Sequence, residues 1–285
     1  MTGVPTCALP ICTIEKEYLH KHFSKPRLKQ TTQIAIDELS IGGGHRYLTI
    51  VLDLKSSAIV FVGEGKRADA LNPFWRRLKA SRATSDAVAM DMSAAYIFAV
   101  TKHLPDATIV FDKFHVVKLM NEKLTQLRRD LYREATDQLG KDVLKGTRWL
   151  LMKNPDHLDD ARNEAARLQE ALALNQPLAT AYYLKEDLRQ LWSQTTKEAA
   201  RTFLERWVRR AVSSGIRLLQ QFAKTLQAHR RGLLCWYDFR ISTGPLEGVN
   251  NKIRTLQRTA YGYRDKVYFH LKLYALHTTH YALIG

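Results

Sequence analysis

Three aspartates in this sequence stand at the ends of apolar runs, where a buried strand would deliver a carboxylate to a loop. Asp37 lies in TQIAIDELSI, Asp91 in DAVAMDMSAAY and Asp112 in ATIVFDKFHVVK. Carboxylate oxygens are the ligands that hard divalent cations prefer, and a pair of such ions supports phosphoryl transfer. Because that chemistry needs several oxygen ligands at one point, the question is which aspartates are ligands and what completes the set.

The hydrophobic pattern indicates the elements that must position these aspartates. Strands are expected over 32–41, 45–54, 57–65, 86–91 and 107–112, and helices over 66–83, 93–105 and from 113 onward. The run Gly42–Gly44 is expected to be the hairpin turn between the first two strands. Three strands joined by tight turns, then two strands with helical crossovers, predict an α/β ribonuclease H-like fold. This fold is a mixed five-stranded sheet flanked by helices.

A large all-helical insertion is expected to interrupt this fold. Residues 118–240 carry Leu, Ala, Arg, Glu and Gln at helical spacing, with no strand-like alternation. We therefore expect a non-native or linker segment over 1–30, the first part of the core over 31–117, the insertion over 118–240, and the end of the core over 241–285. Three tryptophans are expected in the core of the insertion: Trp149, Trp192 and Trp207.

Glu247 is the candidate for the third carboxylate. It follows the Gly244–Pro245 turn in STGPLEGVNNKIR, at the start of a helix expected to pack on the sheet. In the predicted strand order Asp91 ends the strand beside that of Asp37, whereas Asp112 ends the strand one further out. We expect Asp37, Asp91 and Glu247 to converge within metal-bridging reach. Each also has an ordinary alternative: a turn for Asp37, a helix cap for Asp91 and a helix-dipole partner for Glu247.

The balance of charge favours a polyanionic partner. The 285 residues include 44 Lys and Arg against 28 Asp and Glu, a formal charge of +16, and 45% are hydrophobic. This composition is typical of a globular protein rather than a disordered one, and it favours nucleic acid as the partner. The cysteines fit neither a disulfide framework nor a zinc site, and no apolar run reaches the roughly 18 residues of a membrane span. We expect a cytoplasmic protein with no membrane partner.

The first residues, MTGVPTCALPIC, lack the basic start of a signal peptide and contain two prolines. They are similar to translated sequencing-adapter read-through. We expect this stretch to lie outside the fold and the natural N-terminus to be missing.

Five stretches resemble the ISL3 family of bacterial insertion-sequence transposases, whose catalytic domain carries a DDE triad. They are IAIDE (34–38), VAMDMSAAY (88–96), IVFDKFHVVK (109–118), AYYLKEDLR (181–189) and LEGVNNKIRTLQRTAYGYRD (246–265). The last stretch is the most specific. Family members also have an N-terminal zinc-binding and helix-turn-helix region that has no counterpart in this sequence, so the chain is expected to be N-terminally truncated.

The resemblance implies that Asp37, Asp91 and Glu247 are catalytic and hold two Mg²⁺ or Mn²⁺ ions. Asp112 and His115 match a supporting pair of related DDE families, which would orient the site or contact DNA; a local cap of the following helix is the alternative. Basic and amide side chains after Glu247 are expected to bind DNA: Asn250, Lys252, Arg254, Arg258, Arg264 and Lys266.

The expected function is DNA end cleavage and strand transfer for an insertion sequence. The expected partners are DNA, at the transposon ends and at the target, and further copies of the chain in a homodimer or higher oligomer. The expected location is the bacterial nucleoid. Two alternatives stay open: a metal-dependent structure-specific nuclease of the same fold, and a non-catalytic DNA-binding remnant. Hydrolysis without strand transfer would favour the nuclease.

Overall fold

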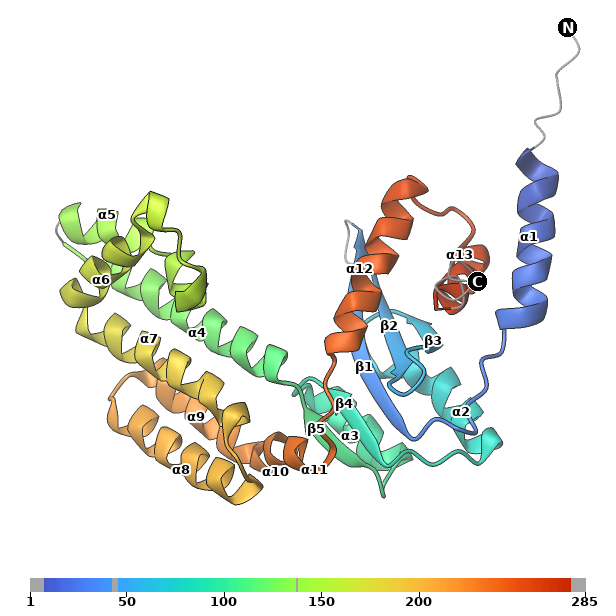
Figure 1. Cartoon of the computed structure of the whole chain (residues 1–285), viewed down its shortest axis with the longest axis horizontal. Coiled ribbons are helices and arrows are strands. Elements are labelled where there is room, and N and C mark those ends of the chain that lie inside the picture. Colours follow the sequence, from blue (N-terminus) through green and yellow to red (C-terminus); the bar gives the residue numbers. More distant parts are fainter. Residues whose placement is uncertain (1–7, 43–45, 137, 278–285) are drawn as a thin grey trace, which may run out of the picture. The chain divides into compact units, whose positions relative to one another are not determined.

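The computed structural model describes residues 8–42, 46–136 and 138–277, and the chain divides into two compact units. The sheet unit comprises Met1–Asp112 and Ile241–Gly285, and the helical unit comprises Lys113–Arg240. The helical unit begins at Lys113 rather than at the expected residue 118 because Lys113 is the first residue of the long helix α4 (Lys113–Glu134). Each unit is described by itself below (Figure 1).

The sheet unit is built on one five-stranded mixed sheet with the order β3-β2-β1-β4-β5. The first three strands are antiparallel neighbours, and β4 and β5 run parallel to β1. This order confirms the predicted ribonuclease H-like topology. The predicted turn at Gly42–Gly44 falls largely outside the described residues. The strands are β1 (Gln33–Gly42), β2 (Arg46–Asp53), β3 (Ile59–Glu64), β4 (Ala87–Met90) and β5 (Thr108–Phe111).

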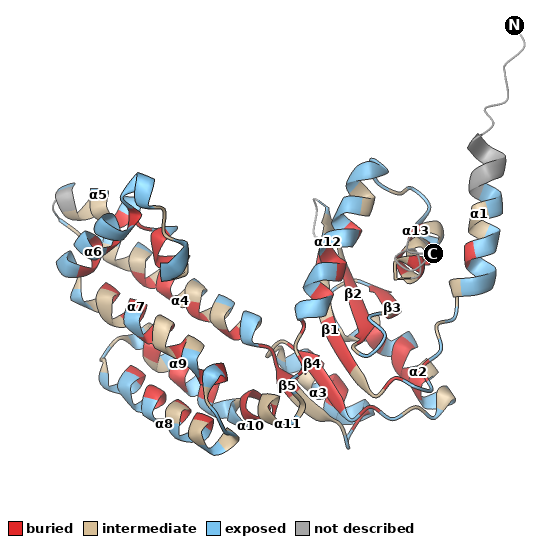
Figure 2. Cartoon of the chain, viewed as in Figure 1, coloured by how far each residue is buried: buried red, intermediate tan, exposed pale blue. Residues whose placement is uncertain are grey.

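The main core of the sheet unit lies on one face of the sheet. Ile34 and Ile36 of β1 pack there with Phe74 and Trp75, because alternate residues of a strand point to the same face. The helices of this face are η1 (Ala68–Leu71), α2 (Asn72–Ser81) and α3 (Ala94–His103). Figure 2 shows β2, β3 and β4 largely buried, whereas β1 and β5 also have partly exposed positions. Because side chains alternate along β1, Asp37 points to the face of the sheet opposite to that of Ile34 and Ile36.

The opposite face is covered by α12 (Gly244–Thr259), which contacts β1. Its buried positions are Leu246, Val249, Asn250 and Ile253, which recur every three or four residues as a helix requires. Figures 1 and 2 show this helix beside β1, with a buried stripe and an exposed outer surface. A helix from the end of the chain thus closes the face to which Asp37 points.

Helix α1 (Ala8–Phe23) occupies part of the segment 1–30 expected to be non-native or a linker. It packs against α13 (Lys266–Ala275), where Leu19 contacts Leu271 and Ala275. Glu15 also pairs with Lys272 at this contact. The packing makes α1 part of the sheet unit, because α13 in turn contacts β3.

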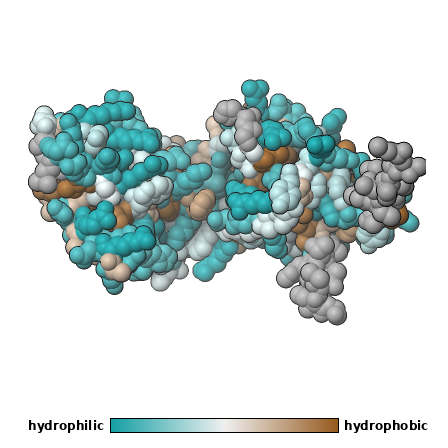
Figure 3. Space-filling view, turned by 90° about the horizontal axis from the view of Figure 1, so that it is seen from above, coloured by the Kyte–Doolittle hydropathy of each residue, from teal (hydrophilic) through white to brown (hydrophobic). Residues whose placement is uncertain are grey.

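The helical unit contains only helices and turns among its described residues. No helix of the described residues is long and apolar enough to cross a bilayer. The surface in Figure 3 is mostly hydrophilic over both units. Besides α4, the unit contains α5 (Gln138–Gly146), α6 (Glu164–Leu174), α7 (Gln176–Arg189), α8 (Lys197–Ser213), α9 (Arg217–Ala228), α10 (Arg230–Leu234) and α11 (Trp236–Phe239), with short 3-10 turns η2 (Leu150–Met152), η3 (Pro155–His157), η4 (Asp160–Arg162) and η5 (Gln190–Ser193).

The tryptophans of the helical unit do not share one environment. Trp207 is 1% exposed, its indole N–H donates to the Leu184 carbonyl at 2.8 Å, and Trp192 is also buried. Trp149 is 64% exposed, with the Arg148 guanidinium 4.6 Å from its ring. The prediction that all three lie in the core is therefore wrong for Trp149. Helical spacing places a residue on a face but does not say that another element covers that face.

Replacing Trp207 with alanine is expected to destabilise the helical unit by about 3–5 kcal/mol, because it leaves a large cavity and removes the donor to a buried carbonyl. Trp149→Ala is the matched control and should cost no more than about 0.5 kcal/mol. Urea denaturation followed by circular dichroism measures both. Equal losses in the two variants would contradict this assignment of the core.

Candidate active site

Asp37 and Asp91 lie side by side at the α12 face of the sheet. The parallel pairing of β1 and β4 runs through Ala35 and Ala89. Two residues further along the chain are Asp37, in β1, and Asp91, the first residue after β4, and side-chain alternation directs both toward the face of those alanines. Neighbouring strands are about 4.8 Å apart. The predicted adjacency of the two aspartates thus follows from the register.

Asp91 is held by the turn that begins α3. Its Oδ1 accepts a hydrogen bond at 2.9 Å from the backbone N–H of Ser93, which precedes the first residue of that helix. The N-cap residue of α3 is Ser93, so this bond forms a local turn before the helix rather than the helix cap that the sequence left as the alternative for Asp91. The bond uses one carboxylate oxygen, so it is compatible with a ligand role for the same side chain.

Asp112 continues the same row one strand further out. It follows Phe111, which pairs with Met90, and its backbone N–H donates to the Met90 carbonyl at 3.2 Å. The side chain is 2% exposed, and Oδ2 accepts a hydrogen bond from the Thr243 hydroxyl at 2.9 Å. The strand order therefore separates Asp112 from Asp37 by the whole of β4, as predicted, and Asp112 anchors the residue before α12.

Asn250 links α12 to Asp37, which lies at the opposite end of the row of aspartates from Asp112. Its side chain is 5% exposed, and Nδ2 donates to Oδ2 of Asp37 at 3.1 Å. Its Oδ1 is buried and has no hydrogen-bond partner among the described residues. A buried amide oxygen in that state costs free energy unless something else approaches it. The sequence placed Asn250 among the DNA-binding residues, but its burial instead makes it part of the carboxylate site.

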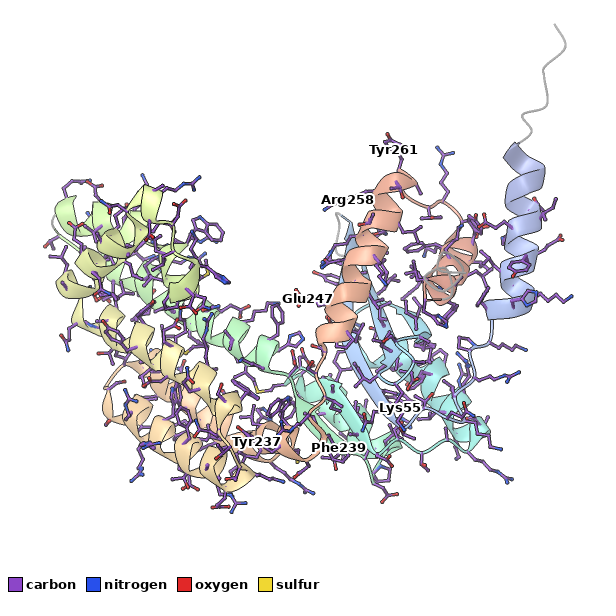
Figure 4. All side chains as sticks on the ribbon, in the orientation of Figure 1. Lys55, Tyr237, Phe239, Glu247, Arg258 and Tyr261 are labelled. Carbon is purple, nitrogen blue, oxygen red and sulfur yellow. The ribbon has the colours of Figure 1, made fainter. Side chains whose placement is uncertain are left out.

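The two anchor points of α12 fix the position of Glu247. Thr243 and Asn250 are about two helical turns apart, or roughly 11 Å of helix axis, close to the roughly 10 Å across two strand spacings. Glu247 lies about one turn from each, between the contact of Thr243 with Asp112 and the contact of Asn250 with Asp37. Its side chain is exposed, and Figure 4 shows it on the same side of α12 as Arg258.

The three candidate carboxylates do not close around a single point. Within residues 8–42, 46–136 and 138–277, no group of three His, Cys, Asp or Glu side chains is gathered so as to hold a metal ion. The expected convergence within bridging reach is therefore absent from this structure. The physical reason is that Asn250, rather than Glu247, faces Asp37, and carboxylates repel one another without a counter-charge.

The donor set nevertheless suits a hard divalent cation. Asp37 and Asp91 present carboxylates from neighbouring strands, and Asn250, whose Nδ2 donates to Asp37, carries a buried Oδ1 for which the described part of the chain offers no hydrogen-bond partner. Ca²⁺, Mg²⁺ and Mn²⁺ prefer carboxylate and amide oxygens of this kind. The residues thus fit such an ion chemically.

A second set of polar side chains lies behind Asp37, on the core face of the sheet. Glu38 forms a hydrogen bond with Tyr96 of α3, whose hydroxyl lies 3.1 Å from Thr49 Oγ1. Burial raises the pKa of Glu38, and the charges of Asp91 and Asp37 raise it further, whereas the Tyr96 hydrogen bond lowers it. The sequence alone did not predict this set, because Glu38, Thr49 and Tyr96 are far apart in sequence and share no motif.

The basic candidates for DNA binding occupy three places. Arg254 and Arg258 follow Glu247 along one exposed flank of α12. Lys252 lies on the other flank, beside a cavity of about 370 Å³ that Pro245 also lines. A third pair follows the helix, beside a cavity of about 840 Å³: Arg264 and Lys266.

His115 belongs to the first turn of α4 in the helical unit, where its ring packs edge-on against Phe114. Asp112 is the last residue of the first segment of the sheet unit. The pair predicted from DKFH is thus divided between the two units, and its joint role remains a prediction.

Comparison with known proteins gives consistent matches. A family model described as transposase, of the DDE class and ISL3 type, matches residues 34–273. The transposase for insertion sequence element IS1001 of Bordetella parapertussis is 36% identical over 266 residues, covering 92% of this chain and 65% of that protein. The transposase for IS1557 of Mycobacterium tuberculosis is 32% identical over 262 residues, covering 84% of this chain and 58% of that protein. The chain thus spans less than two thirds of either relative.

Among solved structures, the Drosophila P element transposase strand transfer complex is similar with a TM-score of 0.48 and 12% sequence identity. That match covers 96% of this chain and 85% of the matched chain.

Proposed function

Because the chain belongs to the ISL3 family of DDE transposases, we propose that it is a catalytic domain for DNA end cleavage and strand transfer of an insertion sequence. The observation that carries the proposal is the position of Asp37 and Asp91 on neighbouring strands beneath α12, the helix that bears Glu247. Carboxylates from two strands and one covering helix are the donors that two-metal phosphoryl transfer requires.

Asp37, Asp91 and Glu247 would hold two Mg²⁺ or Mn²⁺ ions, with Asn250 Oδ1 as a further oxygen donor. When bound, such ions supply positive charge at the reacting phosphate and lower the pKa of water. The Glu247 carboxylate would turn toward the sheet by side-chain rotation, since its backbone lies between the contacts of α12 with Asp112 and with Asp37.

The other residues of the site would hold these carboxylates in place. The amide of Asn250 orients Asp37, and the Ser93 N–H orients Asp91. The hydrogen bond from Thr243 to buried Asp112 fixes the start of α12, and with it the position of Glu247. Side chains locked by such contacts lose less conformational freedom when a substrate phosphate arrives.

DNA is the proposed partner, both at the transposon ends and at the target. The formal charge of +16 and the exposed Arg254 and Arg258 beside Glu247 support contacts with a phosphate backbone. Cleavage of two ends calls for at least two copies of the site, so we propose a homodimer or higher oligomer on DNA. The DNA partner and the bacterial relatives favour a cytoplasmic location at the nucleoid.

The proposed site predicts that divalent metal stabilises the fold. At a Mn²⁺ concentration about 100-fold above the dissociation constant, binding adds about 2.7 kcal/mol, or roughly 5–10 °C in Tm. Asp37→Asn keeps an acceptor for Asn250 but removes the charge, so its Tm should not change with Mn²⁺. Differential scanning calorimetry with and without Mn²⁺ measures both shifts.

The matched control for this measurement is Asp106→Asn, an exposed aspartate just before β5. It should keep the full Mn²⁺ shift. Equal shifts in Asp37→Asn and wild type would refute the metal site. Absence of a shift in wild type would favour the alternative of a DNA-binding remnant.

A further inference from the structure

The sheet unit contains a cavity of about 840 Å³ that the proposed chemistry does not use. It lies where α12 ends and α13 begins. Its walls come from the end of β1, the start of β2, the end of β3, the loop between the two helices, and the adjoining turns of both helices. A volume in the range of roughly 300–1,000 Å³ is typical of a site for a small organic group.

Several aromatic residues line this cavity, among them Tyr261, Tyr263 and Phe269. Tyr261 is 100% exposed and has a left-handed backbone with φ of 51°, followed by Gly262 with φ of 94°. A left-handed conformation costs free energy for a residue with a side chain, so this ring is held in solvent against a local cost. In the same lining, Tyr263 stacks on Phe269 with ring centroids 4.8 Å apart. The cavity thus has a stacked pair of rings in its wall, and Tyr261 adds a ring that is fully exposed to solvent.

The charges at the cavity are mainly positive. Among its described lining residues, Arg46, Arg264 and Lys266 are basic, and the acidic residue is Glu64. Glu64 pairs with Lys266 at 2.7 Å. The Glu64 carboxylate is therefore engaged with the lysine rather than with Arg46 or Arg264. Aromatic faces beside guanidinium groups match a nucleotide, whose base stacks and whose phosphate binds arginine.

Most of the length of α12 separates the cavity from Glu247. Figure 4 shows Glu247, Arg258 and Tyr261 in succession along α12. From Glu247 to Tyr261 the helix and its C-terminal turn span about 20 Å. That corresponds to about six nucleotide steps of a DNA strand at 3.4 Å per step. A strand bound at the carboxylates and along the arginine flank would therefore reach the cavity.

We propose that this cavity holds one unpaired nucleotide of bound DNA, with its base stacked on Tyr261 and its phosphate against Arg46 and Arg264. The proposal rests on the proposed DNA-handling function and adds a second, separate contact to it. A paired base cannot present its face, because its neighbours in the duplex cover it. The site therefore distinguishes an unpaired nucleotide from the same sequence in a perfect duplex.

Binding of two labelled duplexes by the full chain tests the proposal, with EDTA present so that cleavage plays no part. One duplex is fully paired, and the other carries a single unpaired 2-aminopurine nucleotide. Wild type should bind the second about tenfold more tightly. The 2-aminopurine fluorescence should fall as the base stacks. Tyr261→Ala should lose both effects and keep its affinity for the paired duplex within about twofold, whereas Tyr261→Phe should keep both.

Further variants separate stacking from charge. Tyr183→Ala, at an exposed tyrosine of the helical unit, should behave as wild type. Arg264→Ala should weaken binding to both duplexes and lower the salt dependence by about one ion. Equal wild-type affinity for both duplexes, or equal weakening of both by Tyr261→Ala, would overturn the cavity proposal alone. Failure of wild type to bind either duplex would overturn the proposed function as well.

Discussion

Asp91→Asn is expected to lower DNA cleavage and strand transfer by about a thousandfold, whereas Asp112→Asn should stay within about tenfold of wild type. Asp91 presents its carboxylate beside Asp37 and below α12, where an amide would supply one weaker oxygen and no charge. The measurement is the rate of end cleavage and of strand transfer on DNA carrying insertion-sequence ends, with Mg²⁺ or Mn²⁺.

Asp112→Asn is the matched control because it makes the same change one strand further out. Its amide oxygen can still accept the hydrogen bond of Thr243, so α12 should remain anchored. An inactive Asp112→Asn variant together with a fully active Asp91→Asn variant would reverse the assignment. Hydrolysis without strand transfer in wild type would instead identify a nuclease of the same fold.

Asn250→Asp is expected to destabilise the metal-free protein by about 1–3 kcal/mol and to make its stability depend strongly on Mn²⁺. The change places a second carboxylate against Asp37, where Nδ2 now donates at 3.1 Å. Two carboxylates this close cannot both ionise without a cost, and burial of Asn250 limits relief by water. A divalent cation between them removes the repulsion. Thermal denaturation with and without Mn²⁺ measures both effects.

Asn251→Asp is the matched control for this variant. It adds the same charge at the next residue of α12, on an exposed side chain that already accepts a hydrogen bond from Arg254. Its stability should change by no more than about 0.5 kcal/mol, with or without Mn²⁺. If Asn250→Asp behaved in the same way, the contact between α12 and Asp37 would not belong to a metal site.

The sequence by itself was enough to predict the strand order and, from it, the relation among the aspartates. Alternating and continuous apolar runs fixed where β1, β4 and β5 would form, because burial requires that pattern. The two crossover helices then fixed the parallel part of the sheet. Since β4 lies between β1 and β5, the adjacency of Asp37 and Asp91 was already contained in the order of elements.

The sequence could not decide which side of α12 meets the sheet at each point. STGPLEGVNNKIR predicts a helix, but Glu247 and Asn250 lie about one turn apart, and either could have faced Asp37. The hydrogen bonds from Thr243 to Asp112 and from Asn250 to Asp37 determine the orientation of α12. In that orientation the Asn250 amide is buried and Glu247 is exposed. Burial depends on what another element covers, which no local pattern contains.

The same reason accounts for the other differences. Trp149 has the spacing of a core residue, but among the described elements its side chain stays exposed. Residues 8–23 fall in the segment expected to be non-native or a linker, and among the described elements α13, from the far end of the chain, gives Leu19 an apolar surface to pack on. Local composition thus determined the elements and their order. The tertiary structure decided the partner of each face, because contacts between residues distant in sequence are set by the packing of whole elements.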